Sequence, residues 1–342
     1  MKASYQPIKI NWKSDGCEKM GGGMGINRDK PDLWKDDIAR SVHMYNDWFI
    51  KFAPEAYRAT RIKSTKTVEE TLKVTENLTN IKTEVLRNNP SALPTLRMST
   101  CPPLAVDRLI GLAGVSKNLV KVMERGNLPS RMAPDELESD LARISQMIEK
   151  MADPDIFVWL AQKHKPSKEE AYRAAVIVAD RLCGAEANPI VRNAQEKRQL
   201  AAIAAWLETR GYKQLPSGNG IKFNAMPPGT FAFRLNIPVG REGASKSINI
   251  PIDAVVMRKT ARPGDLPLLI EAKSAGDFTN VNKRRKEEAS KINQLRHTHG
   301  KCVTYILFLC GYFDSGYLGY EAAEGMDWVW EHRIDDLEKF GL

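Results

Sequence analysis

Apolar residues recur at helical spacing through the first half of the chain. One stripe advances by four and three residues and consists of Ile38, Val42, Tyr45, Phe49 and Phe52. Pro54 should end this helix, because proline lacks the backbone N–H that the next turn needs. A second stripe lies between Leu137 and Met151, and the capping box Ser167-Lys-Glu-Glu170 begins a third helix that should end near Gly184. The pattern predicts an almost wholly helical region over residues 31–185.

From about residue 186 the apolar period changes from helical to alternating. A helix should first run from Asn188-Pro189 to Gly211. Three strands, a helix and a fourth strand should follow it, at residues 231–239, 248–257, 266–273, 280–298 and 303–309. The predicted order is α-β-β-β-α-β, an α+β or α/β core that follows a large helical N-terminal region.

The first thirty residues show no apolar period. They contain Gly21-Gly-Gly-Met-Gly25, but no strand before it and no helix after it is evident, so a phosphate-binding glycine loop is disfavoured. We predict a flexible arm over residues 1–30, a helical region over 31–185 and a second domain over 186–342. The length of 342 residues is typical of two domains or of one large domain with an added layer.

Composition narrows the class of protein. The 42% hydrophobic and 27% charged content excludes a wholly disordered chain. The longest mainly apolar run, from Val303 to Cys310, is too short to span a membrane, and we expect no secretory signal at the N-terminus. Five cysteines occur at no metal-ligand spacing, which favours free thiols in a reduced cytoplasmic protein.

The net charge of +9 is unevenly distributed. Residues 311–342 carry eight acidic and two basic side chains, so the residues before them have a net charge of +15. A basic body beside an acidic C-terminal segment is typical of a protein that binds a polyanion. The same charge is equally compatible with an ordinary solvated surface, so charge alone leaves both interpretations open.

Three charged residues on two predicted strands form the candidate catalytic site. Asp253 lies on the second strand, and Glu271 and Lys273 lie on the third, where the period of two directs both to one face. If the strands pair, Asp253 can lie beside Glu271, and two such carboxylates repel unless a cation lies between them. Their oxygens suit Mg²⁺, with Mn²⁺ as a substitute. Lys273 would then help to deprotonate or orient a water and stabilise developing negative charge.

Another carboxylate, Glu196, belongs to the helix that precedes the strands. It shares a helical face with the apolar residues Leu200, Ile203 and Leu207. Because an unpaired buried charge costs several kcal/mol, this position predicts either a catalytic, metal-linked role or a charged partner. The alternatives to the metal-linked role are an ion pair with Arg192 or another arginine, or a position at the rim of the helix face.

An aspartate on one strand and Glu-x-Lys on the next resemble the core of the PD-(D/E)xK nucleases. As a bare motif, the pattern is also compatible with a solvated sheet edge that carries ordinary salt bridges. Here both halves lie on predicted strands in the α-β-β-β-α-β order, although Pro251-Ile252-Asp253 departs from the strict form, which has proline directly before aspartate. The resemblance implies that Asp253 and Glu271 hold Mg²⁺ and that Lys273 serves the attacking water.

Longer strings over nearly the whole chain resemble the XamI family of type II restriction endonucleases. In the helical region these strings cover residues 34–42, 45–49, 96–103, 107–113 and 180–184. In the second half they are Arg192-Asn-Ala-Gln-Glu-Lys-Arg-Gln199 and Gly276-Asp-Phe-Thr-Asn-Val-Asn-Lys-Arg-Arg-Lys286. The resemblance implies a bacterial enzyme with a restriction-endonuclease-like core that makes Mg²⁺-dependent double-strand cuts in DNA at a short specific site.

The segment after the Glu-x-Lys strand is strongly basic. Lys283, Arg284 and Arg285 belong to an unbroken run of four cations, which phosphate groups would neutralise. Such contacts position DNA without reading its bases, so we predict DNA binding here. A solvated helix start is the alternative.

Two further function classes remain open at this point. One is another nuclease on the same core, such as a repair, junction-resolving or RNA-directed enzyme, and the other is an inactive DNA-binding relative, which the intact Asp253, Glu271 and Lys273 disfavour. One catalytic set per chain cuts one strand, so we expect a homodimer on palindromic DNA. The helical region would serve DNA recognition or dimerisation, and residues 186–342 would form the catalytic domain. Protective methylation would come from a separate cognate methyltransferase, because no methyltransferase signature is evident.

Overall fold

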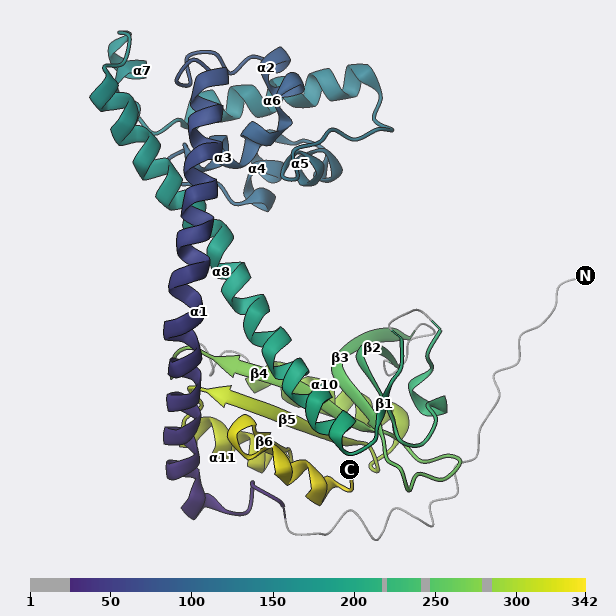
Figure 1. Ribbon diagram of the computed structural model, residues 1–342. Coiled ribbons are helices and arrows are strands. Elements are labelled where there is room, and N and C mark those ends of the chain that lie inside the picture. The colour runs from purple at the N-terminus through teal and green to yellow at the C-terminus, as the bar shows by residue number, and fades with distance from the viewer. Residues whose placement is uncertain (1–24, 217–219, 241–246, 279–284) are drawn as a thin grey trace, which may run out of the picture. The chain divides into compact units, whose positions relative to one another are not determined.

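The computed structural model describes residues 25–216, 220–240, 247–278 and 285–342 (Figure 1). The chain forms two compact units: the sheet unit, residues 1–50 with 193–342, and the helical unit, residues 51–192. Two long helices, α1 (Pro31–Val74) and α8 (Lys168–Thr209), contribute residues to both units. The units therefore divide the chain inside these helices, whereas the apolar period had suggested a boundary at residue 185.

Both long helices continue through prolines at which the sequence predicted a boundary. Helix α1 runs through Pro54, and α8 runs through Gly184 and Pro189, so the helix ends predicted near Pro54 and Gly184, and the new start at Pro189, were wrong. A proline removes one backbone hydrogen bond, but apolar burial on both sides of it holds the helix together. In α8, Leu182 is buried in the core of the helical unit and Ile203 in that of the sheet unit.

The helical unit has an apolar core formed by short helices and by parts of α1 and α8. Leu141, Ile144 and Ile148 are completely buried in this core, as their spacing predicted. Between the two long helices the elements are α2 (Thr83–Asn88), η1 (Pro90–Ala92), α3 (Leu93–Met98), α4 (Val106–Ala113), α5 (Lys117–Met123), α6 (Pro134–Met151) and α7 (Val158–Gln162).

A mixed sheet forms the centre of the sheet unit. Its strands lie side by side in sequence order: β1 (Lys213–Gln214), β2 (Thr230–Val239), β3 (Ile248–Met257), β4 (Leu268–Ala275), β5 (Thr304–Gly311) and β6 (Asp327–Trp330). Strand β3 is antiparallel to β2 and to β4, and the other neighbours pair in parallel. The predicted α-β-β-β-α-β order is confirmed by α8, β2, β3, β4, α10 (Arg285–His299) and β5.

Helices cover the two faces of this sheet (Figure 1). Ile203 and Leu207 of α8 pack against one face, and Ile292 and Leu295 of α10 pack in the cluster on the other. The short strands β1 and β6, helix α11 (Ser315–Ala323) and the 3₁₀ helices η2 (Phe223–Ala225) and η3 (Glu331–Phe340) were not predicted. The sheet is thus a middle layer between α8 and α10, which fixes the surroundings of every residue on its strands.

Strand β2 exchanges its two faces in the middle. Phe231 and Phe233 pack in the cluster on the α8 side, whereas Leu235 and Ile237 pack in the cluster on the α10 side. A period of two would have placed all four side chains on one face. The alternation over residues 231–239 therefore predicted the strand correctly but hid a change of face within it.

Strand β3 changes face at the corresponding point. Ile252 packs on the α10 side and Ala254 on the α8 side, although two residues separate them. In the β2–β3 ladder, Phe233 pairs with Ala254 and Leu235 pairs with Ile252. The change of face therefore falls between these two pairs, at Arg234 and Asp253. Arg234 has a φ of +54°, which is the local cause of the kink in the hairpin.

The acidic C-terminal segment is part of the folded sheet unit. Asp327 accepts hydrogen bonds from the backbone N–H groups of residues 26–28, at 2.5 to 3.1 Å. Glu331 forms an ion pair with Arg198 of α8 at 3.0 Å, and Asp314 caps the start of α11. Carboxylates of residues 311–342 therefore form hydrogen bonds and ion pairs within the sheet unit.

The cysteines follow the predicted free-thiol state at three positions. Cys101, Cys183 and Cys310 are free, whereas Cys302 is disulfide-bonded, so the prediction of free thiols throughout was wrong. Spacing along the sequence does not report which sulfurs meet in space. Among the described residues, no helix has the length and apolar content needed to cross a bilayer.

Candidate active site

Asp253 and Glu271 lie opposite one another where β3 and β4 stop pairing. The last pair of this antiparallel ladder joins Ala254 to Ile270, and the same register places Asp253 opposite Glu271. The Asp253 carboxylate accepts a hydrogen bond from the backbone N–H of Ala272 at 2.9 Å. A side chain therefore takes the place of the next backbone pair, and the structure brings the two carboxylates together.

The buried carboxylate pair carries electrostatic penalties that a bound divalent cation would remove. Glu271 is 4% exposed, and its Oε2 is buried without a hydrogen-bond partner among the described residues. Burial, and then the charge of Glu271, raise the pKa of Asp253 to about 6. An unsatisfied carboxylate oxygen beside a carboxyl that resists ionisation fits a metal with oxygen ligands.

Protein ligands beyond this pair are few. The described residues contain no group of three or more His, Cys, Asp or Glu side chains arranged to hold a metal ion. Mg²⁺ commonly binds through one or two carboxylates and keeps several waters, so a pair is a sufficient donor set for that ion.

Lys273 lies between two carboxylates on the same side of the sheet. Its Nζ is 3.1 Å from Glu271 Oε1 and 2.8 Å from Glu288 Oε1. Burial lowers the pKa of Lys273, but the charges of Glu271 and Glu288 outweigh this effect and raise the pKa above its ordinary value. Lys273 is therefore held as an ammonium ion next to the carboxylate pair.

Helix α10 contributes two charged side chains that sequence reasoning missed. Glu288 is completely buried, and it accepts a hydrogen bond from Tyr305 of β5 at 2.5 Å. Lys291 Nζ is 2.5 Å from Glu271 Oε1, the oxygen that Lys273 also contacts. Together with Lys273, these residues form an unbroken series of alternating charges from Glu288 to Lys291.

A signal for Glu288 was present in the sequence. Glu288 stands four residues before Ile292 and seven before Leu295, so it shares the apolar face of α10. A carboxylate on an apolar helix face needs a partner only where it is buried, and the Glu196 side chain is 38% exposed. Glu288 meets this condition, since its carboxylate is completely buried and paired with Lys273.

Glu196 has an arginine partner. Arg234 Nη2 and Nε lie 2.8 and 3.2 Å from Glu196 Oε1. This is the predicted alternative of an ion pair near the rim, although the partner is Arg234 rather than Arg192. The charge of Glu196 is also among those that raise the pKa of Asp253, so it acts on the carboxylate pair through the electric field.

Helix α8 fixes the end of the strand that carries Lys273. Gln199 Nε2 donates hydrogen bonds to the backbone carbonyls of Lys273 and Phe308, both at 3.2 Å. Gln195 Nε2 donates to the Ser274 hydroxyl at 3.1 Å. These amides hold β4 and β5 from the α8 side, which restrains the position of Lys273.

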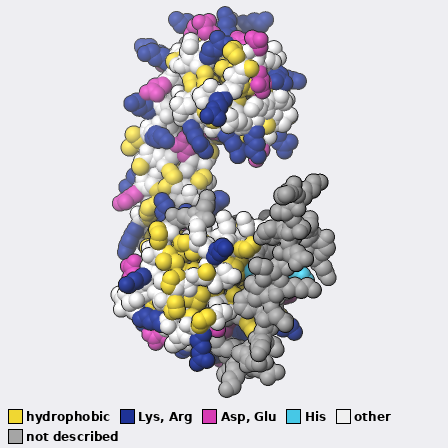
Figure 2. All heavy atoms as spheres, turned by 90° about the vertical axis from the view of Figure 1, so that its right-hand side faces the viewer, with side chains coloured by type: hydrophobic (Ala, Val, Ile, Leu, Met, Phe, Trp, Pro, Cys, Tyr) yellow, Lys and Arg dark blue, Asp and Glu magenta, His cyan; other side chains and the backbone are white. Residues whose placement is uncertain are grey.

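The predicted basic DNA contact falls at the edge of the described structure. Lys283 and Arg284 lie outside the described residues, and α10 begins at Arg285, whose side chain is also outside them. On the face shown in Figure 2, Lys and Arg side chains are spread over the helical unit, with Asp and Glu among them. The basic run stays a prediction.

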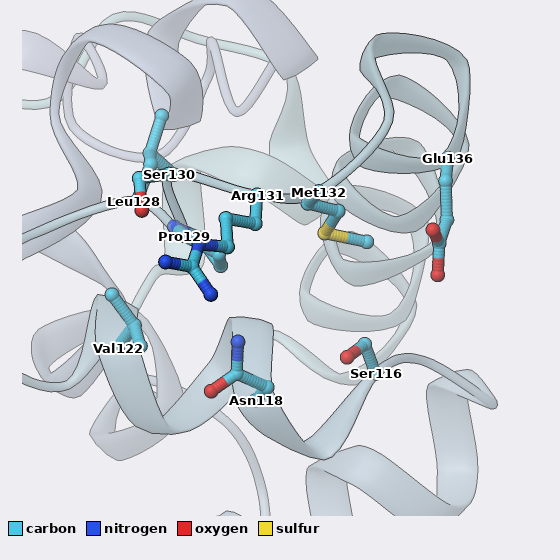
Figure 3. A pocket seen from close by; sticks show the side chains of 9 residues that line it. All are labelled: Ser116, Asn118, Val122, Leu128, Pro129, Ser130, Arg131, Met132 and Glu136. Carbon is cyan, nitrogen blue, oxygen red and sulfur yellow. The ribbon is translucent and has the colours of Figure 1, made fainter.

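A cavity of about 460 Å³ lies in the helical unit, and its lining residues fall between Ser116 and Glu136 (Figure 3). Its walls come from α5, from the segment that leads to α6 and from the first turn of α6. The side chains of Asn118 and Arg131 point toward one another across it (Figure 3). It contains none of the predicted catalytic residues.

The similarity to known proteins extends over most of the chain. The model of the XamI restriction endonuclease family matches residues 76–330. The chain belongs to the XamI restriction endonuclease family. The type II restriction enzyme SalI of Streptomyces albus G is 53% identical over 316 residues, which are 92% of this chain and 99% of that relative. The resemblance expected from the sequence is therefore confirmed.

Membership in the XamI family defines the class of enzyme. The protein is a type II restriction endonuclease, a hydrolase whose substrate is DNA. Among solved structures, that of protein VC1899 from Vibrio cholerae covers 73% of this chain and 54% of its own, at 10% identity and a TM-score of 0.27. Values this low support no inference about fold or function.

Proposed function

We propose that this XamI-family enzyme cuts both strands of DNA at a short specific sequence with Mg²⁺, for which Mn²⁺ can substitute, and that Asp253 and Glu271 hold the metal. The observation that carries this proposal is the register that sets Asp253 opposite Glu271, together with the unpartnered Oε2 of Glu271. When bound, the metal supplies a water of lowered pKa and neutralises charge on the phosphate. Enzymes of this class generally need a divalent cation.

Lys273 acts on the attacking water and on the phosphate in this proposal. Its ammonium is fixed by Glu271 and Glu288, at 3.1 and 2.8 Å, so its position is set before DNA arrives. A preorganised cation stabilises the negative charge that develops on the phosphate oxygens as water attacks. Because the group is held charged by both carboxylates, we assign it to orienting the water and stabilising charge.

Glu196 belongs to the proposed catalytic set through its charge. Its carboxylate acts on Asp253 from α8 while it pairs with Arg234. If Glu196 helps to attract the metal or its water, Glu196→Gln should lower the cleavage rate and leave the melting temperature nearly unchanged. A loss of stability with full activity would restrict Glu196 to its ion pair.

The helical unit is proposed to add sequence recognition or dimer contacts. Amide and guanidinium side chains are the usual readers of adenine and guanine, and Asn118 and Arg131 share one cavity. A homodimer supplies two catalytic sets for two strands. We expect a separate cognate methyltransferase and a cytoplasmic location, where the DNA substrate lies. Family membership favours this function over a repair nuclease, a junction resolvase or an inactive relative.

The test is digestion of a mixed-sequence plasmid with Mg²⁺, followed by sequencing of the fragment ends. Discrete fragments with a shared terminal sequence are expected, and chelation of the metal should stop cleavage. Asp253→Ala and Glu271→Ala should abolish cleavage while DNA binding in Ca²⁺ persists. Full activity in either variant would overturn the assignment of the site, and a smear of fragments would overturn sequence specificity.

A further inference from the structure

Arg234 has a backbone conformation that is unusual for its place in a strand. Its φ is +54°, in the left-handed region, and it lies in the middle of β2. In the described part of the chain, the other non-glycine residues with positive φ lie in a turn, at Glu76–Leu78, or at a helix end, at Lys163. This conformation is unfavourable for a residue with a Cβ atom, and such strain is concentrated at functional sites.

The strained residue lies beside the proposed metal ligands. The β2–β3 pairs on either side of it, Phe233 with Ala254 and Leu235 with Ile252, set Arg234 opposite Asp253. No ladder pair joins these two residues within the described strands, since the kink falls there. The conformation of Arg234 therefore shapes the hairpin at the position of Asp253.

The ion pair with Glu196 does not account for an arginine at this position. The side chains of Arg234 and Glu196 are 60% and 38% exposed, and exposed ion pairs contribute little to stability. That small gain does not offset the strain of the left-handed conformation. A glycine would adopt the same backbone without strain, so the side chain must serve another purpose.

Exposure distinguishes Arg234 from the two lysines of the site. Lys273 and Lys291 are 16% and 24% exposed, and both are held by carboxylates inside the charge series. A DNA phosphate that approaches Asp253, Glu271 and Glu196 would meet three negative groups. Arg234 is a cation at this place that solvent, and therefore DNA, can reach.

We propose that Arg234 binds a phosphate of the DNA backbone next to the cleaved bond, and that Glu196 holds its guanidinium in place until DNA replaces that carboxylate. The planar guanidinium fork matches two oxygens of a phosphate as well as it matches a carboxylate. This inference rests on the proposed site at Asp253 and Glu271.

The experiment compares stability with DNA binding in Arg234→Gly. Because glycine accepts a φ of +54°, the melting temperature should rise, by roughly 2 °C. Affinity for a short random-sequence duplex in Ca²⁺ should fall about tenfold, as expected for one charged hydrogen-bonded contact. The slope of log affinity against log salt should decrease by about 0.9.

Two controls separate strain from charge. Lys163→Gly relieves a φ of +53° in the helical unit and should reproduce the gain in stability. Arg210→Ala removes another surface arginine of the sheet unit, which pairs with Asp335 and Glu338, and should leave the salt slope unchanged. In the other direction, Glu196→Gln frees Arg234 from its competitor and should tighten DNA binding about threefold.

Either of two results overturns the inference. Arg234→Gly could bind DNA with wild-type affinity and salt slope, which would show that no phosphate contact is lost. It could also lose stability, which would show that the arginine is kept for the fold. Neither result depends on cleavage, so failure of the metal-site proposal, seen as full activity of Asp253→Ala, is a separate outcome.

Discussion

Asp253→Asn should stabilise the metal-free protein at neutral pH while it abolishes cleavage. The change removes a charge and keeps the shape of the side chain, and the asparagine oxygen can still accept the hydrogen bond from the Ala272 N–H. The wild-type carboxyl is unfavourable here because burial and Glu271 raise its pKa from 3.8 to about 6. A residue placed for metal binding is thus expected to weaken the fold in which it lies.

The sign and size of this change in unfolding free energy follow from the linkage between proton binding and folding. Between pH 4 and pH 6 the folded protein binds more protons at Asp253 than the unfolded chain does, so this group makes stability fall as the pH rises. Above about pH 7 the loss is complete and amounts to about 3 kcal/mol, at 1.36 kcal/mol for each pKa unit. Asparagine does not titrate, so the advantage of the variant should be near zero at pH 4 and largest above pH 7.

The assay is urea unfolding of both proteins in a chelating buffer at several pH values between 4 and 8. Asp36→Asn, at an exposed position of α1, is the matched control and should show no such pH-dependent gain. Excess Mg²⁺ should then stabilise the wild type and not Asp253→Asn, since a ligand stabilises the state that binds it. A variant as stable as the wild type at every pH, or less stable at pH 8, would refute the reasoning.

Three further predictions concern α10, the basic run and the assembly. Glu288→Gln should lower stability by about 3 kcal/mol in chemical unfolding and slow cleavage, because it removes one of the two buried counter-charges of Lys273; a neutral effect on both would contradict the positioning role. Neutralising Lys283, Arg284 and Arg285 should weaken binding to all duplexes alike and reduce the salt slope by roughly one per lost contact, whereas altered sequence preference at an unchanged slope would indicate base reading. Light scattering of a catalytically dead variant on cognate DNA in Ca²⁺ should give two chains per duplex, and one chain with concerted cutting of both strands would exclude the dimer.

The sequence by itself determined the local part of the site. The alternating period located β2 and β3, a mainly apolar run located β5, and the spacing of two placed Glu271 and Lys273 on one face of β4. These features depend on residues close in sequence, where backbone geometry dictates direction. The strings in both halves of the chain also carried the resemblance to the XamI family, which the match over residues 76–330 confirmed.

Local sequence rules did not predict the boundaries of the two long helices. Pro54 and Pro189 are signals for an end and a start, yet α1 and α8 pass through both. Local propensity is a small term, and burial of residues such as Leu182 and Ile203 in two separate cores outweighs it. Local sequence rules detect the proline, but they do not report the apolar cores against which the helix packs on each side of it.

Only the tertiary structure decided how the charges of the site are partnered. Glu288 and Lys291 reach Glu271 and Lys273 because α10 packs on the same side of the sheet, and Glu196 meets Arg234 at 2.8 Å across thirty-eight residues of sequence. The change of face at Arg234 and Asp253 likewise depends on a left-handed φ that no alternation of residue types reports. Partners of a buried charge are chosen by packing between distant segments, and for that reason the sequence identified Asp253, Glu271 and Lys273. It did not identify Glu288 and Lys291, which pair with Lys273 and Glu271.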